Sequence, residues 1–262
     1  MMRFRGLRRD AAASIVAVSA MVPETFEIEL ASSSMLAPSV RRLVFGRTDG
    51  RPLAFQPGQW LNLVLPLPGG EIRRAYSIAS PPNGTPQFEL AVTEVTAGPG
   101  SNYLATLGPG AKLRAIGPQG FFTRAPLDPA PALMVATGTG VTPIYSMMQT
   151  AAAAGSATPI WLLLGVRRMA DLLYRPELEA LAAASPTIRV HFTLSQGEPE
   201  WAGRRGYVQT HVPELWEGLR CLERGEPHIY VCGLERMVSA VRNLVRKEMG
   251  IPRERVHSER YD

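Results

Sequence analysis

The sequence predicts two domains in series, a six-stranded antiparallel β-barrel followed by a doubly wound α/β domain on a parallel sheet. Up to about residue 125, short segments of alternating polar and apolar residues are separated by turns. A proline-rich break, "APLDPAPA" at 125–132, comes next, and after it long apolar runs alternate with helical segments. Because 262 residues suffice for two ordinary domains, we expect the barrel at 23–126 and the α/β domain at 127–262.

The barrel prediction rests on six short segments with an alternating pattern. They are "TFEIELA", "VRRLVFGR", "QWLNLVLP", "YSIAS", "QFELAVTEV" and "KLRAIG". Turn sequences such as "PLPGG" and "PPNGTP" separate them. Strands with one internal face favour a closed barrel, because closure removes unpaired edges. A helix-sized segment, "SNYLATL" at 101–107, lies between the fifth and sixth strands.

The α/β prediction rests on apolar runs that alternate with amphipathic segments. The runs are "LMVATGT", "IWLLLGV", "RVHFTLS" and "HIYVCG", and the helical segments lie at 143–154, 175–184, 210–222 and 236–249. Fully apolar strands are typical of a parallel sheet covered on both faces. Ligands in such domains bind beyond the carboxyl ends of the strands.

Composition and charge exclude several classes of function. The net charge of +5 is spread along the chain, which favours an acidic partner or a phosphorylated ligand over nucleic acid. We expect no membrane span, since no apolar run is long enough. Two cysteines, Cys221 and Cys232, are too few for a four-cysteine iron–sulfur site or a disulfide framework. We therefore expect no metal site and a cytoplasmic location.

Residues 1–22 have two interpretations. Four arginines between positions 3 and 9 precede the stretch "AAASIVAVSA", which is compatible with a targeting segment. Asp10 interrupts the transition and no clear cleavage pattern follows. We favour an N-terminal arm and keep the targeting segment as the alternative.

The segment "ATGTGVTP", 136–143, is a candidate phosphate-binding loop. A buried strand ends in Thr137, Gly138, Thr139 and Gly140, and we expect a helix to begin near Thr142 with Pro143 at its first position. Glycines allow close approach of an anion to the backbone, and a helix N-terminus offers free N–H groups. The alternative is an ordinary glycine-rich turn between a strand and a helix.

A second segment, "PGSNYL" at 99–104, repeats this pattern in the barrel domain. Ser101 or Asn102 is a candidate cap for a short helix, which would leave backbone donors pointing toward a second phosphate. The alternative is a capped helix without a ligand.

Taken in order, several segments resemble the ferredoxin–NADP⁺ reductase family. They are "PGQW", "RAYSIAS", "GPGSNYL", "GPQGFF", "ATGTGVTPIYSMM", "LLLGVRRMADLLYRPELEAL", "YVCGLERM" and "ERY". The resemblance extends from about residue 55 to residue 261. It implies an FAD held by the barrel and a nicotinamide dinucleotide held by the α/β domain.

The family's flavin-binding Arg-x-Tyr-Ser motif falls on Arg74, Ala75, Tyr76 and Ser77. Arg74 offers forked donors to a pyrophosphate oxygen, Tyr76 can pack on the flavin, and Ser77 can reach the reactive edge of the ring. The family's second pyrophosphate contact falls at a helix start, on Gly100, Ser101 and Asn102.

On the nucleotide side, the resemblance implies that Thr137, Gly138, Thr139 and Gly140 receive the pyrophosphate of the nicotinamide dinucleotide. It also implies that Cys232 and Gly233 lie beside the nicotinamide, although a cysteine after an apolar strand is also a common small buried residue.

The chain end matches a Glu-x-Tyr tail at Glu259 and Tyr261, whose ring covers the flavin face that nicotinamide approaches. Asp262 follows the tyrosine, which departs from chains that end in the aromatic residue; a solvated terminus is the alternative.

Two features bear on the choice between NADPH and NADH. Phosphate-preferring members of the family carry Ser-Arg after the third strand of this domain, whereas this chain has Ser195 followed by Gln196. Arg205, Tyr207 and Gln209 resemble the segment that grips the adenine end in plant-type members. We favour NADPH and keep NADH as possible.

The resemblance implies a flavin-dependent oxidoreductase that transfers a hydride between NADPH and FAD. Ser77 and Glu259 would handle a proton near the flavin N5, Cys232 would position the nicotinamide, and Tyr261 would yield its place to it. Electrons would pass to a separate one-electron carrier, an acidic ferredoxin or flavodoxin.

Three alternatives to this function remain. The chain could be an NADH-dependent reductase component of an oxygenase system, or a reductase of free flavin or a quinone. From another class, it could be a regulatory subunit that binds flavin or nucleotide without turnover.

Overall fold

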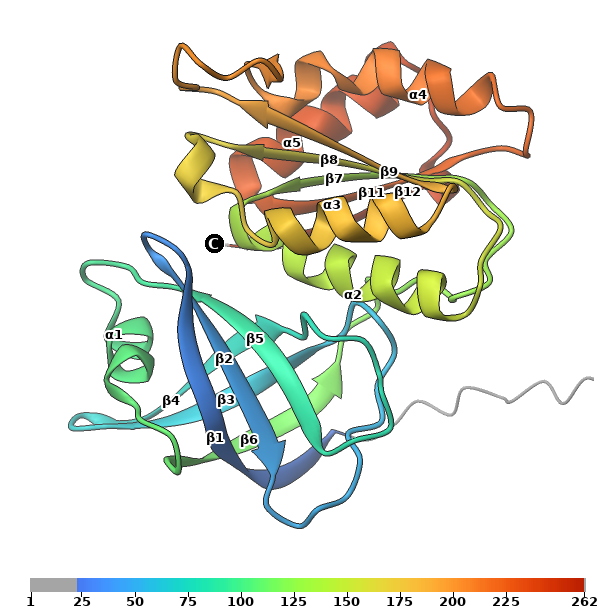
Figure 1. The fold of residues 1–262 in the computed structure, drawn as a ribbon. Coiled ribbons are helices and arrows are strands. Elements are labelled where there is room, and N and C mark those ends of the chain that lie inside the picture. The colour runs from blue at the N-terminus through green and yellow to red at the C-terminus, as the bar shows by residue number, and fades with distance from the viewer. Residues whose placement is uncertain (1–22, 262) are drawn as a thin grey trace, which may run out of the picture.

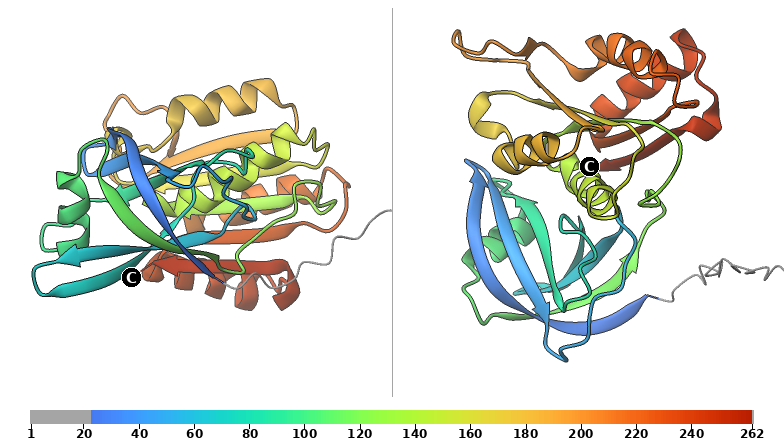
Figure 2. Two further views of the ribbon diagram at one scale, coloured as in Figure 1. Left: turned by 90° about the horizontal axis from the view of Figure 1, so that it is seen from below. Right: turned by 45° about the vertical axis from the view of Figure 1, so that its right-hand side comes forward.

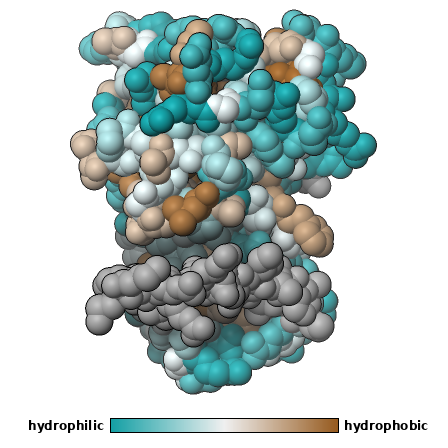
Figure 3. Space-filling view, turned by 90° about the vertical axis from the view of Figure 1, so that its right-hand side faces the viewer, coloured by the Kyte–Doolittle hydropathy of each residue, from teal (hydrophilic) through white to brown (hydrophobic). Residues whose placement is uncertain are grey.

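The computed structural model describes residues 23–261, in two stacked domains that each contain a six-stranded sheet (Figure 1). The interpretation of residues 1–22 as an arm or targeting segment lies outside the described residues, as does Asp262. Within the described range, no helix is long and apolar enough to cross a bilayer. The face in Figure 3 is mainly hydrophilic, with apolar residues scattered over it, as is usual for a protein surface.

The first sheet is antiparallel and curled, with the strand order β4-β3-β6-β1-β2-β5. Its strands are β1 (Glu24–Ala37), β2 (Val40–Arg47), β3 (Trp60–Leu67), β4 (Gly70–Ser77), β5 (Gln87–Thr93) and β6 (Lys112–Gln119). Buried leucine, isoleucine and phenylalanine side chains from these strands fill its interior. Between the two end strands, the described residues form an isolated bridge from Ile78 to Leu90. The predicted six-stranded antiparallel fold is confirmed, but its closure is one bridge rather than a full ladder.

The boundaries of β4 differ from the sequence prediction of a strand at 76–80. The strand covers Gly70–Ser77, because the hairpin with β3 pairs Leu67 with Gly70 and Trp60 with Ser77. The segment "GEIRRAYS" does not alternate between polar and apolar residues and is mostly exposed, so its sequence pattern does not indicate the full strand. The helix that follows β5, α1 (Pro99–Thr106), lies close to the predicted 101–107.

The second sheet is parallel, with the order β10-β9-β8-β7-β11-β12. Its strands are β7 (Ala132–Thr137), β8 (Ile160–Val166), β9 (Ile188–Leu194), β10 (Arg204–Arg205), β11 (His228–Leu234) and β12 (Val256–Tyr261). Helices α2 (Val141–Ala153) and α3 (Arg175–Ala184) cover one face, and α4 (Val212–Arg220) and α5 (Glu235–Asn243) cover the other (Figure 1). Single turns of other helix types are η1 (Gly138–Gly140), η2 (Met169–Asp171), η3 (Val208–Thr210), η4 (Leu244–Glu248) and η5 (Arg253–Arg255). The predicted doubly wound domain is confirmed.

The two domains share a hydrophobic core, which fixes the position of one relative to the other. Barrel residues such as Val40 and Ala91 belong to the same buried cluster as the residues of α2. Hydrogen bonds cross the interface from Gln149 Nε2 to the Ala79 carbonyl at 3.0 Å and from the Tyr174 hydroxyl to Glu89 at 2.7 Å. Figure 2 shows that the C-terminal end of the described chain lies between the domains. The last strand therefore brings its side chains to the domain boundary.

Candidate functional site

A cleft of about 1040 Å³ lies between the two domains, and its lining contains most of the residues that the sequence predicted to bind cofactors. These are Arg74, Ala75, Tyr76, Ser77, Gly100, Ser101, Thr137, Gly138, Thr139, Ser195, Tyr207, Gln209 and Tyr261. The predicted residues outside its lining are Asn102, Gly140, Arg205, Cys232, Gly233 and Glu259. Motifs far apart in the sequence thus meet in one cavity.

The end of β4 supplies one wall of the cleft. Arg74 is exposed to it, while the neighbouring Arg73 lies outside the lining. Tyr76 packs partly against the barrel core, and burial raises the pKa of its phenol to about 12, so it stays a neutral hydrogen-bonding group. Ser77 is buried at the end of the strand. One strand therefore offers a guanidinium, a phenol and a hydroxyl to the same ligand.

The start of α1 lies beside Arg74. A Cβ atom added to Gly100 would come within 3.1 Å of a Leu65 methyl group and 3.2 Å of Arg74 Cγ, so glycine permits this close approach. Backbone N–H groups in the first turn of a helix and a guanidinium at the same place form a suitable site for a pyrophosphate.

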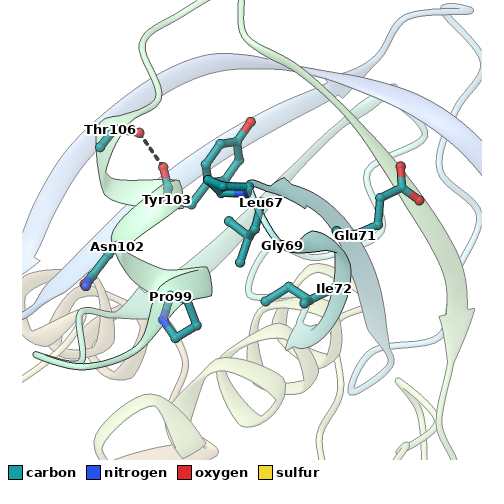
Figure 4. Close-up of a pocket in the computed structure, with 10 residues that line it drawn as sticks. Leu67, Gly69, Glu71, Ile72, Pro99, Asn102, Tyr103 and Thr106 are labelled. Carbon is teal, nitrogen blue, oxygen red and sulfur yellow. Dashed lines mark hydrogen bonds between the residues drawn. The ribbon is translucent and has the colours of Figure 1, made fainter.

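The predicted capping of α1 by Ser101 or Asn102 is wrong. The residue before the helix is Gly98, and Ser101 Oγ donates to its carbonyl at 3.1 Å. The same oxygen accepts from the Val95 N–H at 3.1 Å. Ser101 therefore holds the turn before the helix, and Asn102 lines a different pocket (Figure 4).

The loop between β7 and α2 has the shape expected of an anion site. Gly138 has φ of +52°, and a Cβ there would meet no described atom within 4 Å, which leaves open space above the loop. Among the described residues, the buried Thr137 Oγ1 has no hydrogen-bond partner. Helix α2 begins at Val141, so Pro143 is its third residue rather than its first. The open space above the loop, the Thr137 hydroxyl and the N–H groups at the start of α2 together suit the pyrophosphate of a dinucleotide.

Two predicted glycines pack the loop rather than line the cleft. A Cβ on Gly140 would lie 2.2 Å from the Cys232 carbonyl oxygen, and one on Gly233 would lie 2.4 Å from Thr137 Oγ1. Both positions therefore need glycine so that the loop can rest on β11.

The end of β12 brings two chemical groups to Ser77, the carboxyl of Glu259 and the hydroxyl of Tyr261. Strands β11 and β12 pair in parallel, with Cys232 opposite Glu259 and Leu234 opposite Tyr261. The Ser77 Oγ lies 2.6 Å from the Tyr261 hydroxyl and donates to Glu259 Oε1 at 3.4 Å. The hydroxyls and the carboxyl thus form a connected network.

Burial controls the protonation of this network. It raises the pKa of Glu259 to about 7, although the hydrogen bond from Ser77 opposes the shift. Burial also raises the pKa of the fully buried Cys232 thiol above its ordinary value, so this thiol stays neutral. Glu259 is therefore suited to proton exchange near neutral pH, and Cys232 contributes a small neutral contact surface.

Of the residues predicted to contact the adenine end of the dinucleotide, only some line the cleft. Tyr207, which is 58% exposed, lines the cleft with Ser195 and Gln209. Arg205 instead donates to the carbonyls of Gly197 at 2.9 Å and Glu198 at 2.7 Å, which ties down a surface loop.

Sequence reasoning missed a basic residue of the cleft, Arg167. It follows β8 and lines the cleft near Ser195, and its carbonyl accepts from the Gln196 N–H at 2.9 Å. The signal was present, since Arg167 follows the apolar run "IWLLLGV" at the carboxyl end of a parallel strand.

Comparisons with known proteins identify the kind of each domain and the family of the chain. The FAD-binding domain of oxidoreductases matches residues 27–123, and the NAD-binding domain of oxidoreductases matches residues 134–243. The chain is 58% identical to ferredoxin–NADP reductase B of Sorangium cellulosum, over 91% of this chain and 98% of that protein. Among solved structures, it resembles the cytochrome P450 reductase GcoB of Amycolatopsis with a TM-score of 0.78 and 28% identity, over 91% of this chain and 70% of that one.

A mutant of the ferredoxin–NADP⁺ reductase of Plasmodium falciparum has the same fold. It matches with a TM-score of 0.77 and 21% identity, over 90% of this chain and 96% of that one. The two domain matches together cover most of the chain, and the identity to the bacterial relative extends over nearly all of that protein. The chain belongs to the ferredoxin–NADP reductase family.

Proposed function

We propose that this protein is a reductase that takes electrons from NADPH through FAD and delivers them to a one-electron carrier protein. The observation that carries this proposal is the single cleft in which the Arg74–Ser77 strand end, the Thr137–Thr139 loop and Tyr261 meet. When bound, FAD supplies the chemistry, since it accepts a hydride and gives electrons up singly. The protein binds, orients and handles the proton.

The binding roles follow from the two halves of the cleft. Arg74 and the start of α1 bind the pyrophosphate of FAD, and Tyr76 packs against its flavin part. The Thr137–Thr139 loop and the start of α2 bind the pyrophosphate of NADPH. Holding both ligands in one rigid cleft turns a meeting of two molecules into an effectively intramolecular step.

The proton follows the polar network at the cleft end. Oxidation of NADPH by a one-electron carrier releases one proton for each pair of electrons. The Ser77 hydroxyl accepts this proton in the cleft while it donates its own to Glu259 Oε1, 3.4 Å away. A carboxyl with a pKa of about 7 can accept that proton and later release it to solvent.

Replacing Tyr261 with serine is expected to tighten binding of NADP⁺ by about tenfold. Its ring lies in the cleft and its hydroxyl is held by Ser77 at 2.6 Å, so a nicotinamide must displace it. Removing the competitor saves roughly one hydrogen bond plus ring contacts, about 1.4 kcal/mol. Titration of the flavin absorbance with NADP⁺ measures the effect. Tyr261→Phe keeps the ring and loses only the hydrogen bond to Ser77, so its affinity for NADP⁺ should lie between those of the parent and the serine variant. A serine variant that binds NADP⁺ no more tightly than the parent would contradict competition.

Replacing Arg167 with alanine is expected to weaken NADPH binding by about 10- to 100-fold and NADH binding hardly at all. A guanidinium near Ser195 can pair with the extra 2′-phosphate, and a charge-assisted hydrogen bond contributes roughly 1.5–3 kcal/mol. Rapid-mixing measurements of flavin reduction against each donor concentration give both affinities. Arg168→Ala, the exposed neighbour outside the cleft lining, is the matched control. Parallel losses for both donors would remove Arg167 from the choice between them.

The carrier protein is proposed to be an acidic ferredoxin or flavodoxin, because this chain has a net charge of +5. The test is NADPH oxidation by the FAD-loaded protein with ferredoxin, flavodoxin, free FMN or a dye as acceptor. We expect reduction of a carrier protein that slows as salt screens the attraction. Reduction of the dye or free FMN alone would contradict a protein acceptor. Preference for NADH with an oxygenase component would favour that alternative function.

A further inference from the structure

A cluster of charged and aromatic side chains joins the two domains beside the cleft. It lies where α2 and α3 face the barrel (Figure 1). Its members, called the interdomain cluster below, are Arg42 on β2, Glu89 on β5, Tyr145 on α2, Tyr174 directly before α3 and Glu177 on α3. All five lie outside the cleft lining, and neither the binding roles nor the proton network described above involves them.

One carboxylate of this cluster connects the domains. Glu89 Oε1 accepts from Arg42 Nε at 3.1 Å within the barrel and from the Tyr174 hydroxyl at 2.7 Å across the boundary. Arg42 Nη2 also donates across the boundary, to Glu177 Oε1 at 2.8 Å. Burial raises the pKa of the Tyr174 phenol, so the hydroxyl keeps the proton that it donates. Two polar contacts therefore tie β2 and β5 to the start of α3.

The backbone of Tyr174 is held in an uncommon conformation. Its φ is +55°, in the left-handed region that bulky residues rarely adopt. Its ring is buried, and the ring centroid lies 4.6 Å from that of Tyr145 and 5.4 Å from the Arg42 guanidinium carbon. Such strain persists only where the surrounding structure holds it. The contacts of the ring and its hydroxyl therefore fix the chain at this point.

The barrel side of the cluster leads to Ser77. The Glu89 carbonyl accepts from the Ala79 N–H at 2.8 Å, and the Glu89 N–H donates to Ser80 Oγ at 3.1 Å. The Ser80 carbonyl accepts from Ser146 Oγ on α2 at 2.7 Å. Ala79 and Ser80 follow Ser77 closely in the chain. Glu89 therefore holds the segment that leaves the hydroxyl at the end of β4.

The other side of the cluster leads to the opposite wall of the cleft. Leu173, directly before Tyr174, lines the cleft, and so does Asp171. Tyr145 lies on α2, whose first residues follow the Thr137–Thr139 loop. The cluster thus connects the wall that carries Ser77 with the wall that carries the glycine loop. The spacing of these walls matters, because a displacement of about 1 Å between reacting groups can slow a reaction about 10²-fold.

We propose that Arg42, Glu89 and Tyr174 are positioning residues for hydride transfer, which hold the NADPH wall of the cleft at a fixed distance from the FAD wall. The inference rests on the function proposed above and adds the residues that set the spacing of its two ligands. In the competing arrangement the apolar contacts between the domains set this spacing alone, and the cluster contributes only to stability.

The test measures flavin reduction at saturating NADPH by rapid mixing, on FAD-loaded protein. In Glu89→Ala, which removes the shared acceptor, we expect a rate about 10- to 100-fold below the parent's. Tyr174→Phe keeps the ring and loses one hydrogen bond, so its rate should fall about fivefold. Glu89→Gln keeps an acceptor oxygen for Tyr174 and should recover most of the rate. Glu179→Ala, which removes an exposed ion pair with Arg175 on the same helix, is the matched control and should react like the parent.

Two further measurements separate positioning from a general loss of structure. Titrations with FAD and with NADP⁺ should give the parent's affinities in Glu89→Ala, because both pyrophosphate sites stay intact. Hydrogen exchange should become faster at Ala79, whose N–H is bonded to the Glu89 carbonyl, and stay unchanged in the Glu179→Ala control.

The possible failures are distinguishable. A parent-like rate in both Glu89→Ala and Tyr174→Phe would overturn the positioning role and leave the reductase function intact. A loss of FAD affinity as large as the loss of rate would also overturn it, since the cluster would then act on stability alone. A parent protein that binds no FAD, or whose flavin NADPH does not reduce, would contradict the proposed function and the positioning role with it.

Discussion

Replacing Ser77 with alanine is expected to slow NADPH-dependent electron delivery by about 10²- to 10⁴-fold, while FAD binding weakens only about fivefold. The hydroxyl is one neutral hydrogen-bonding group toward the cofactor, which contributes roughly 1 kcal/mol. It is also the link between the cleft and Glu259, at 3.4 Å, and loss of a positioned proton carrier has the larger cost. The two measurements are rapid-mixing kinetics with NADPH and titration of flavin-free protein with FAD.

The control for this variant is Ser34→Ala, which removes an exposed hydroxyl from β1 outside the cleft lining. It should leave both the rate and the FAD affinity at the parent's values. Turnover in Ser77→Ala equal to that of the parent would exclude Ser77 from proton transfer. A loss of FAD affinity as large as the loss of rate would instead assign Ser77 to cofactor binding.

Much of the fold could be predicted because the two domains have different local patterns. Alternating segments such as "VRRLVFGR" and buried runs such as "IWLLLGV" correspond to β2 and β8. Strand β12 was missed, because its "VHSERY" pattern is polar and partly exposed at a sheet edge, where burial gives little signal. That strand places Glu259 and Tyr261 in register with β11, which a sequence pattern alone cannot supply.

Site residues were predictable where they lie at the carboxyl end of a parallel strand. Thr137 ends the buried strand β7 and Gly138 follows it, and both line the cleft as that position predicts. The sequence could not predict which of two neighbouring pockets a side chain on a short helix lines. Asn102 follows Ser101 directly, yet rotation by one residue on α1 directs it to a different pocket. Arg205 is bound by loop carbonyls that lie near it only after folding.

The pH dependence of electron delivery should come from Glu259. Burial raises the pKa of its carboxyl to about 7, so it is protonated below neutral pH and ionised above it. Only the ionised form can accept the proton that leaves Ser77. The rate of carrier reduction in the parent should therefore rise as pH increases through about 7. The Glu259→Gln variant keeps a polar side chain of similar size but cannot titrate, so its profile should show no step there.

At pH 8 we expect the parent to reduce the carrier about 10²-fold faster than Glu259→Gln. By pH 5.5, where few Glu259 carboxyls are ionised, this ratio of rates should be about 30-fold smaller. Steady-state carrier reduction across this range measures it, and FAD titration checks that binding is equal. The same pKa shift also makes the stability of the folded protein depend on pH. Because folding raises the pKa of this acid, its contribution to stability is present below about pH 4.5 and is lost as pH rises through 7. The glutamine variant should therefore be at least as stable as the parent at pH 8. A parent profile that is flat around pH 7, or an identical step in the variant, would assign the proton to another group.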